Sequence, residues 1–353
     1  MKPPPVLPLA ETLALQQSAC ARAGSQLYAD VLGGVIADVA KGGVCGDILG
    51  PHGDDPFATA LPLRFLGAVH RLVLVGRAPA LAAHYPSAGG APGPGLVGEF
   101  IAAVAEHRPE IEDRLGDGVQ TNEVGRSAVL APGYARVTEQ TGLPLRVLEI
   151  GASGGLNLRW DRYWYDTGVT TMGDPDSPVR FVGAWQDAGA GLPRLGPVDV
   201  VERAGCDRNP IDVGTDDGRT TLRAYLWPDQ VERRARLEAA FAVAEAVPAT
   251  VERADLGEWA AARLSRPVSG VATVVAHSIV WQYVPRASRD RLRSALQEAG
   301  SRATADAPLA WLRMEPAGPV ADLRLTRWPG GEQQVLATAE YHGIPVYWGP
   351  PPS

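Results

Sequence analysis

The stretch LPLRVLEIGASGG, residues 143–155, decides the expected fold. A short run of aliphatic and β-branched residues ends in an acid, and a cluster of glycines and small residues follows it. This pattern predicts a buried strand that runs into a tight turn, because glycine tolerates backbone conformations that other residues avoid. The stretch therefore predicts the first strand of an α/β sheet.

The chain after this stretch alternates between predicted strands and predicted helices. The predicted helices include 231–246 and 287–300, and the strand candidates are 197–205, 249–256, 270–280 and 307–316. Such alternation predicts a parallel sheet with helices on both faces. The last segments, LRLTRW, EQQVLATAEY and IPVYW, are separated by glycine turns and are expected to form antiparallel strands.

The part before the sheet has a different pattern. From residue 10 to about residue 139, apolar residues recur at helical spacing. We therefore expect a helical N-terminal domain over 1–142 and an α/β domain over 143–353, with an insertion at about 159–197.

Composition limits the classes of function. The 353 residues include 33 Lys and Arg against 40 Asp and Glu, a net charge of -7, which disfavours nucleic acid as a partner. Cys20, Cys45 and Cys206 show no metal-binding spacing and are expected to be reduced, buried thiols, and no metal site is expected. No apolar run is long enough for a signal peptide or a membrane span, so we expect a cytoplasmic protein that does not enter a membrane.

The glycine turn and two later acids resemble the cofactor site of S-adenosylmethionine-dependent methyltransferases. In that family an acid precedes the first glycine by two residues, as Glu149 precedes Gly151, and further glycines follow at alternate positions. Here Gly155 keeps this pattern, whereas Ser153 replaces the middle glycine. The resemblance implies a Rossmann-like fold and S-adenosylmethionine as the cofactor, with Asp207 at the ribose and Asp255 near the adenine; the six cofactor-binding residues would be Glu149, Gly151, Ser153, Gly155, Asp207 and Asp255.

The fourth strand of the predicted sheet ends in AHSIVWQYVP, a position that lies beside the acceptor substrate in methyltransferases. His277 could act there as a general base, because imidazole titrates near neutral pH. It could equally be a histidine satisfied by hydrogen bonds at a strand end. Trp281 could contact the substrate or belong to the core.

The motifs as a set resemble a bacterial family, domain of unknown function 2332 (DUF2332). They are QTNEVGRSA, EIGASGGLNLRWDRYWY, GCDRNP, LWPDQ, HSIVWQY and the closing WPGG and HG turns, and they extend over nearly the whole chain. The resemblance implies a methyltransferase-like fold but no agreed reaction.

Two of these motifs supply further candidate residues. QTNEVGRSA could form a lid over the substrate or a capped, salt-bridged helix start, and WDRYWY could line the acceptor pocket or fasten the insertion to the sheet. On the functional interpretation Glu123 and Asp161 join His277 as catalytic residues. The substrate-binding residues would then be Gln120, Asn122, Arg126, Asn157, Tyr163 and Trp281.

We therefore expect a methyltransferase that acts on a small molecule, and three other functions stay open. Gly151 to Gly155 also fits G-x-S-x-G, so Ser153 could be the nucleophile of a serine hydrolase, with Asp255 and His277 or His342 following in the required order. The fold could instead carry out a non-methylating displacement or elimination on a natural-product intermediate, as a homo-oligomer or with a partner subunit. The third alternative is a non-catalytic ligand-binding protein.

Overall fold

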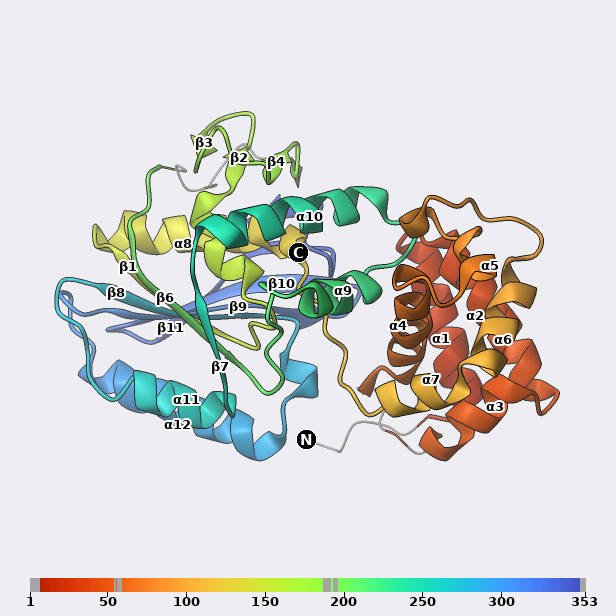
Figure 1. Ribbon diagram of the computed structural model, residues 1–353. Coiled ribbons are helices and arrows are strands. Elements are labelled where there is room, and N and C mark those ends of the chain that lie inside the picture. The colour runs from red at the N-terminus through yellow and green to blue at the C-terminus, as the bar shows by residue number, and fades with distance from the viewer. Residues whose placement is uncertain (1–6, 54, 56–58, 187–191, 193–195, 350–353) are drawn as a thin grey trace. The chain divides into compact units, whose positions relative to one another are not determined.

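A computed structural model describes residues 7–53, 55, 59–186, 192 and 196–349 (Figure 1). The chain divides into two compact units. Unit 1 consists of Met1–Thr121 and Thr215–Ala235, and unit 2 consists of Asn122–Gly214 and Arg236–Ser353. The helix α10, Val231–Ala246, begins in unit 1 and ends in unit 2.

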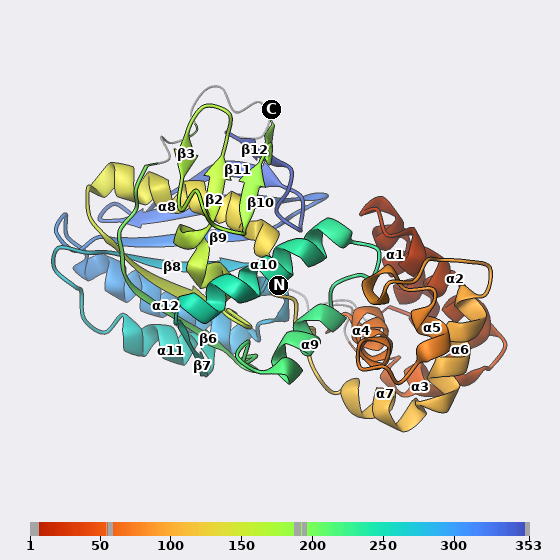
Figure 2. The same cartoon turned by 45° about the horizontal axis from the view of Figure 1, so that its top comes forward.

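Unit 1 is built from helices (Figure 2). Their buried apolar residues form one core. Phe65 and Phe100, for example, are fully buried and meet edge to face with ring centroids 5.8 Å apart. The helices of its first segment are α1 Leu9–Arg22, α2 Gln26–Ala40, α3 Val44–Leu49, η1 Gly50–His52, α4 Leu61–Leu74, α5 Pro79–Ala82, η3 Pro86–Ala88, α6 Leu96–Glu106 and α7 Arg108–Arg114.

The second segment of unit 1 comes from the middle of the chain. It contains α9, Asp216–Ala224, and Trp227, which is buried in the core of unit 1. The Asp229 carboxylate accepts hydrogen bonds from the Ser25 hydroxyl at 2.6 Å and from the Leu27 N–H at 3.1 Å. These contacts at the start of α2 bind the segment to the N-terminal helices, a connection that no local pattern in the sequence predicts.

Unit 2 contains a sheet of nine strands among the described residues, in the order β5-β12-β11-β10-β9-β8-β1-β6-β7. Strands β9, β8, β1, β6 and β7 are parallel to their neighbours within this group. Strands β10, β11 and β12 follow β9 as antiparallel strands, and β5 at the edge pairs with β12 in parallel. The bounds are β1 Leu145–Ile150, β5 Trp185–Gln186, β6 Val200–Asp207, β7 Thr250–Arg253, β8 Ala272–Ser278, β9 Leu309–Ala317, β10 Val320–Trp328, β11 Glu332–Ala339 and β12 Val346–Trp348.

Helices cover both faces of this sheet (Figure 1). On one face lies α8, Ser127–Thr141, whose Gly133 leaves room for the side chain of Leu312 from β9. On the other face α11, Leu256–Arg263, and α12, Arg286–Arg302, share a core with Leu148 of β1 and Val275 of β8. Every residue of β1 is buried, as a central strand covered on both faces requires.

The segment between β1 and β6 holds a small second sheet in the order β3-β2-β4. It follows the 3₁₀ helix η5, Leu156–Arg162, and its strands are β2 Trp164–Asp166, β3 Thr171–Met172 and β4 Arg180–Val182. This is the region of the predicted insertion at about 159–197, and its residues 187–191 and 193–195 lie outside the described residues.

The mixed α/β architecture with a large, mostly parallel sheet agrees with the prediction. Each of the predicted strands has a counterpart, from β1 to the antiparallel strands β10, β11 and β12. Unit 2 begins at Asn122, upstream of the expected position 143, because α8 packs on the sheet. Among the described residues, the helices are too short or too polar to cross a bilayer.

Candidate functional site

The glycine turn after β1 has the backbone that its sequence requires. Gly151, Ser153 and Gly155 have φ values of +68°, +52° and +68°. Glycine adopts such values readily, whereas a serine there carries strain. Asp207, at the end of β6, closes the turn: its Oδ2 accepts the Ser153 N–H at 2.9 Å and its Oδ1 accepts the Asn209 N–H at 2.8 Å. The ends of β1 and β6 are thus joined by one carboxylate.

Glu149 lies two residues before this turn and is buried, with 4% of its surface exposed. Its Oε2 has no hydrogen-bond partner within the part of the chain that the structure describes. Burial raises the pKa of Glu149 to about 8, the positive charges of Arg126 and Arg159 act in the opposite direction, and the charge of Asp207 raises it further. A buried carboxyl oxygen without a donor is uncommon in folded proteins and is a candidate for ligand contact.

The corner after β8 lies against the glycine turn. A Cβ atom on Gly151 would come within 2.4 Å of Val280 Cγ2, so glycine is needed there for packing as well as for its φ value. Ile279, which precedes Val280, has φ +49°, an unusual value for a β-branched residue. A protein side chain therefore fills the space beside Gly151, and the segment that carries it is strained.

Residues 122–127 pack on the segment that follows the glycine turn. Asn122 Oδ1 accepts the Leu156 N–H at 2.9 Å, and the Asn157 amide donates to the Glu123 carbonyl at 3.2 Å. The Ser127 hydroxyl donates to Asn157 Oδ1 at 2.7 Å. The predicted residues Asn122 and Asn157 thus hold two parts of the backbone together. Glu123 caps the 3₁₀ helix η4, Val124–Arg126, by accepting the Gly125 N–H at 2.9 Å.

Arg126 connects this motif to two other parts of unit 2. Its guanidinium donates to the carbonyl oxygen of Ser278, at the end of β8, and to that of Tyr341, both at 3.1 Å. A Cβ atom on Gly343 would lie 2.3 Å from the Gly125 carbonyl oxygen, so the HG turn and the VGR segment meet backbone to backbone. The motifs QTNEVGRSA, EIGASGGLNLRWDRYWY, HSIVWQY and HG therefore meet at the ends of β1 and β8. Gln120, also predicted to bind substrate, belongs to unit 1.

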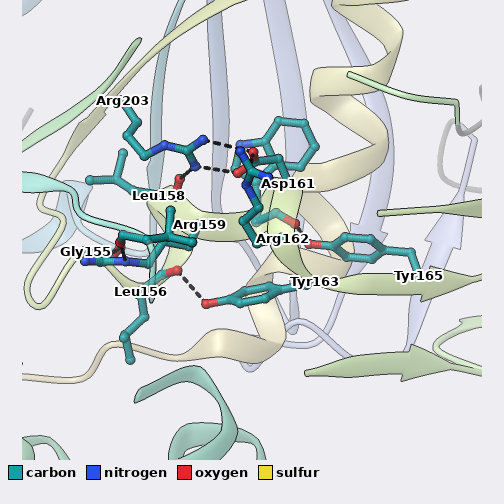
Figure 3. Close-up of polar contacts among 11 residues, drawn as sticks. Gly155, Leu156, Leu158, Arg159, Asp161, Arg162, Tyr163, Tyr165 and Arg203 are labelled. Carbon is teal, nitrogen blue, oxygen red and sulfur yellow. Dashed lines mark hydrogen bonds and ion pairs between the residues drawn. The ribbon is translucent and has the colours of Figure 1, made fainter. Parts of the chain in front are cut away.

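Figure 3 shows the polar contacts that hold η5 in place after the glycine turn. Arg203 of β6 forms a bidentate ion pair with Asp161, in which Nη2 and Oδ2 are 2.9 Å apart. The Tyr163 hydroxyl donates to the Leu156 carbonyl oxygen at 2.6 Å. Arg159 donates to the Gly155 carbonyl at 2.7 Å. Asp161 therefore attaches η5 to the sheet through Arg203, as one of the two interpretations expects, whereas Tyr163 bonds to η5 itself.

Asp255, predicted to lie near an adenine, has another arrangement. Its Oδ1 accepts the N–H groups of Gly257 at 3.0 Å and Glu258 at 3.3 Å, which makes Asp255 the N-cap of α11. Its other oxygen accepts the Ser288 hydroxyl. The structure therefore gives Asp255 a role in joining α11 to α12.

His277 is fully buried near the end of β8. Its Nδ1 lies 2.7 Å from Glu315 Oε1, and its ring stacks on Trp281 with centroids 5.4 Å apart. Its Nε2 has no hydrogen-bond partner among the residues described. Glu315 also accepts the backbone N–H of Val280 at 3.1 Å. The sequence carried no signal for Glu315, because the pairing of β8 with β9 brings it to His277.

Metal-dependent, thiol-based and serine-hydrolase chemistries have little support from the described residues. Within the described ranges no three His, Cys, Asp or Glu side chains gather in a way that could hold a metal ion. The three cysteines are buried and free, and burial raises the pKa of Cys20 to about 11, which disfavours a reactive thiolate. His277 Nε2 has no hydrogen-bond partner in the described part of the chain, so it does not form the hydrogen bond to Ser153 that a hydrolase nucleophile would require.

Comparison with known proteins gives one match. No curated protein and no solved structure matches the chain. One family, described as uncharacterised proteins conserved in bacteria, matches residues 10–348. The chain therefore belongs to the DUF2332 family.

Proposed function

We propose that unit 2 binds S-adenosylmethionine where β1 and β6 end and transfers its methyl group to a small molecule. The observation that carries the proposal is the buried Glu149 carboxyl group beside a glycine turn, whose Oε2 has no hydrogen-bond donor among the described residues. Parallel α/β sheets bind ligands beyond the carboxyl ends of their strands, where neighbouring connections diverge. β1 has β6 on one side and β8 on the other, so this point lies at the end of β1.

The charge of the cofactor suits Glu149. S-adenosylmethionine carries an ammonium group and a sulfonium, and a cation beside a buried carboxyl group favours its ionised form. The ammonium group would supply the donor that Glu149 Oε2 lacks. Because the pKa of Glu149 is raised to about 8, such a partner would convert a neutral acid into a paired carboxylate.

Asp207 suits the ribose. Each of its oxygens accepts one backbone N–H, and a carboxylate oxygen can accept a second hydrogen bond. Asp207 would therefore hold the Ser153 turn and the ribose hydroxyls together. Asp255 is left out of this assignment, because both its oxygens join α11 to α12.

The corner at Ile279 and Val280 has to move for a ligand to lie beside Gly151. The left-handed conformation of Ile279 costs about 1 to 3 kcal/mol. This strain destabilises the arrangement in which Val280 packs on Gly151. We infer that the cofactor displaces Val280 from Gly151. The proposal assigns no base to this face, and positioning would supply most of the acceleration because the sulfonium already activates the methyl group.

Equilibrium binding of S-adenosylmethionine to the full chain, measured by calorimetry, tests the proposal. We expect binding by the wild-type protein and a loss of about 10-fold or more in affinity for Glu149→Gln, because a charged hydrogen bond is removed. Glu202→Gln is the matched control, since Glu202 lies on β6 and pairs with Arg146 at 2.8 Å. Absence of binding by the wild-type protein would remove methyl transfer and favour the non-methylating or ligand-binding alternatives.

A further inference from the structure

Guanidinium groups gather on the face of the sheet that α12 covers. Arg313 of β9 and Arg324 of β10 are directly opposite each other in the antiparallel register, so their side chains project to the same face. This is the face of Trp311, which packs with the core beneath α12. Like charges placed directly opposite each other destabilise a sheet, and Asp322, which pairs with Arg324 at 2.8 Å, offsets one of these two charges.

Among the described residues, no carboxylate forms an ion pair with Arg313. Its guanidinium donates to Thr326 Oγ1 at 3.4 Å and to Gln333 Oε1, both neutral. Burial lowers the pKa of Arg313 to about 10, and the charges of Arg324 and Arg293 lower it as well, while Glu315 raises it. The neighbouring guanidinium groups therefore disfavour the charged form of Arg313.

Two tryptophans stack with Arg313, Arg293 and Arg289. The Cζ of Arg313 lies 3.8 Å from the ring centroid of Trp311, and those of Arg293 and Arg289 lie 5.1 Å and 5.8 Å from that of Trp281. The two indole rings are 5.9 Å apart. Stacking on aromatic rings restricts the arginine side chains, so less conformational entropy is lost when an anion binds.

The acids near this group have other partners. Glu315 is bound to His277 and to the backbone of Val280, and Asp322 pairs with Arg324 at 2.8 Å. Arg293 pairs with the exposed Asp290 on the same helix at 3.3 Å, a contact of small energetic value. Arg293 and Arg324 keep 52% and 36% of their side chains exposed, so an ion from solvent can reach them.

We propose that Arg293, Arg313 and Arg324 form a binding site for an oxyanion, a carboxylate or phosphate group, on the α12 face of the sheet. Guanidinium groups bind both kinds of anion through paired N–H donors. The site is independent of the proposed function, because Glu149 projects to the opposite face of the sheet.

Thermal unfolding of the full chain tests this site. The protein is titrated with inorganic phosphate or with benzoate, and sodium chloride keeps the ionic strength constant. We expect one or both anions to raise the unfolding temperature in a saturable way that chloride does not reproduce. A response to phosphate alone identifies a phosphate site, and a response to benzoate alone identifies a carboxylate site. No response to either anion beyond that to chloride overturns the proposal.

Variants locate the response. Arg313→Gln and the exposed Arg293→Gln should each weaken the apparent affinity by about 10-fold, and Arg313→Lys should recover part of it. Arg327→Gln is the control, because Arg327 lies on β10, as Arg324 does, but is opposite Ala310 of β9 and projects to the other face. Wild-type affinity in both Gln variants would overturn the assignment. S-adenosylmethionine binding should be unchanged in Arg313→Gln, so this test and that of the proposed function fail separately.

Discussion

Glu149 and His277 project to opposite faces of the sheet, although their strands are neighbours. β1 and β8 pair in parallel with Glu149 beside Ala276, and side chains alternate along a strand, so the next residue, His277, points the other way. The expected arrangement, with His277 as base beside a cofactor held by Glu149, would place both groups on one face. The two groups therefore belong to different environments, and each can be tested alone.

The first prediction concerns Glu149 and pH. The pKa of Glu149 is raised from 4.5 to about 8, so between these values the folded protein keeps a proton that the unfolded chain has lost. The free energy of unfolding should fall as pH rises through this window, by at most about 1.4 kcal/mol per pH unit from this group. Below pH 4.5 the contribution is fully present, and above pH 8 it is lost.

Glu149→Gln should remove this contribution. Urea unfolding of both proteins between pH 5 and pH 8 should show the variant becoming more stable relative to wild type as pH rises. Parallel pH profiles for the two proteins would contradict a raised pKa at Glu149.

The second prediction concerns Asp207. Asp207→Ala removes the acceptor of the Ser153 and Asn209 N–H groups and should lower the free energy of unfolding by about 1 to 3 kcal/mol. It should also weaken S-adenosylmethionine binding about 10- to 100-fold through the loss of charged hydrogen bonds. Urea unfolding and calorimetry measure the two effects. An unchanged dissociation constant in a folded variant would count against Asp207 as the ribose acceptor.

The third prediction concerns Ser153. A left-handed backbone costs a residue with a side chain about 1 to 2 kcal/mol, so Ser153→Gly should relieve strain and raise the unfolding temperature. Ser153→Ala keeps the strain and removes the hydroxyl, and it separates the two contributions. Equal losses of stability in both variants would contradict a strained backbone at Ser153, because only Ser153→Gly relieves the strain. A serine nucleophile would additionally require Ser153→Ala to abolish hydrolysis of an ester substrate.

The fourth prediction concerns the ion pair of Asp161 and Arg203. Both side chains are nearly buried, so Asp161→Ala leaves an uncompensated cation and should cost about 3 to 5 kcal/mol. The double variant Asp161→Ala/Arg203→Met removes both charges and should be less destabilised than Asp161→Ala alone. Urea unfolding of the cycle measures the difference. A double variant as unstable as the sum of both single variants would show that the two residues act independently.

Local patterns in the sequence predicted the sheet well, and contacts between distant strands could not be predicted. The aliphatic run before Gly151 is a buried strand with its glycine turn, and the segments after the parallel strands are antiparallel. The attachment of Thr215–Ala235 to unit 1 depends on Trp227 and Asp229, which show no local sign of their partners. Asp255 did carry a signal that was missed: an acid three residues before Glu258 at the start of a helix is typical of an N-cap.

The last prediction concerns Glu315, the acid that sequence patterns did not reveal. It accepts hydrogen bonds from His277 Nδ1 and from the backbone N–H groups of Val280 and Trp281. Glu315→Ala leaves these buried donors without an acceptor and should lower the free energy of unfolding by about 2 to 4 kcal/mol. Glu315→Gln keeps one carbonyl acceptor and should lose less.

A second measurement separates the loss of stability from the orientation of the imidazole. Glu315 fixes the proton of His277 on Nδ1, so ¹⁵N NMR of the imidazole should show Nδ1 protonated in wild type and a mixture of tautomers in Glu315→Gln. Trp281 stacks on the same ring, and Trp281→Phe, which keeps an aromatic ring, should leave the tautomer as in wild type. An unchanged tautomer in Glu315→Gln would mean that packing, and not the carboxylate, holds His277 in its orientation.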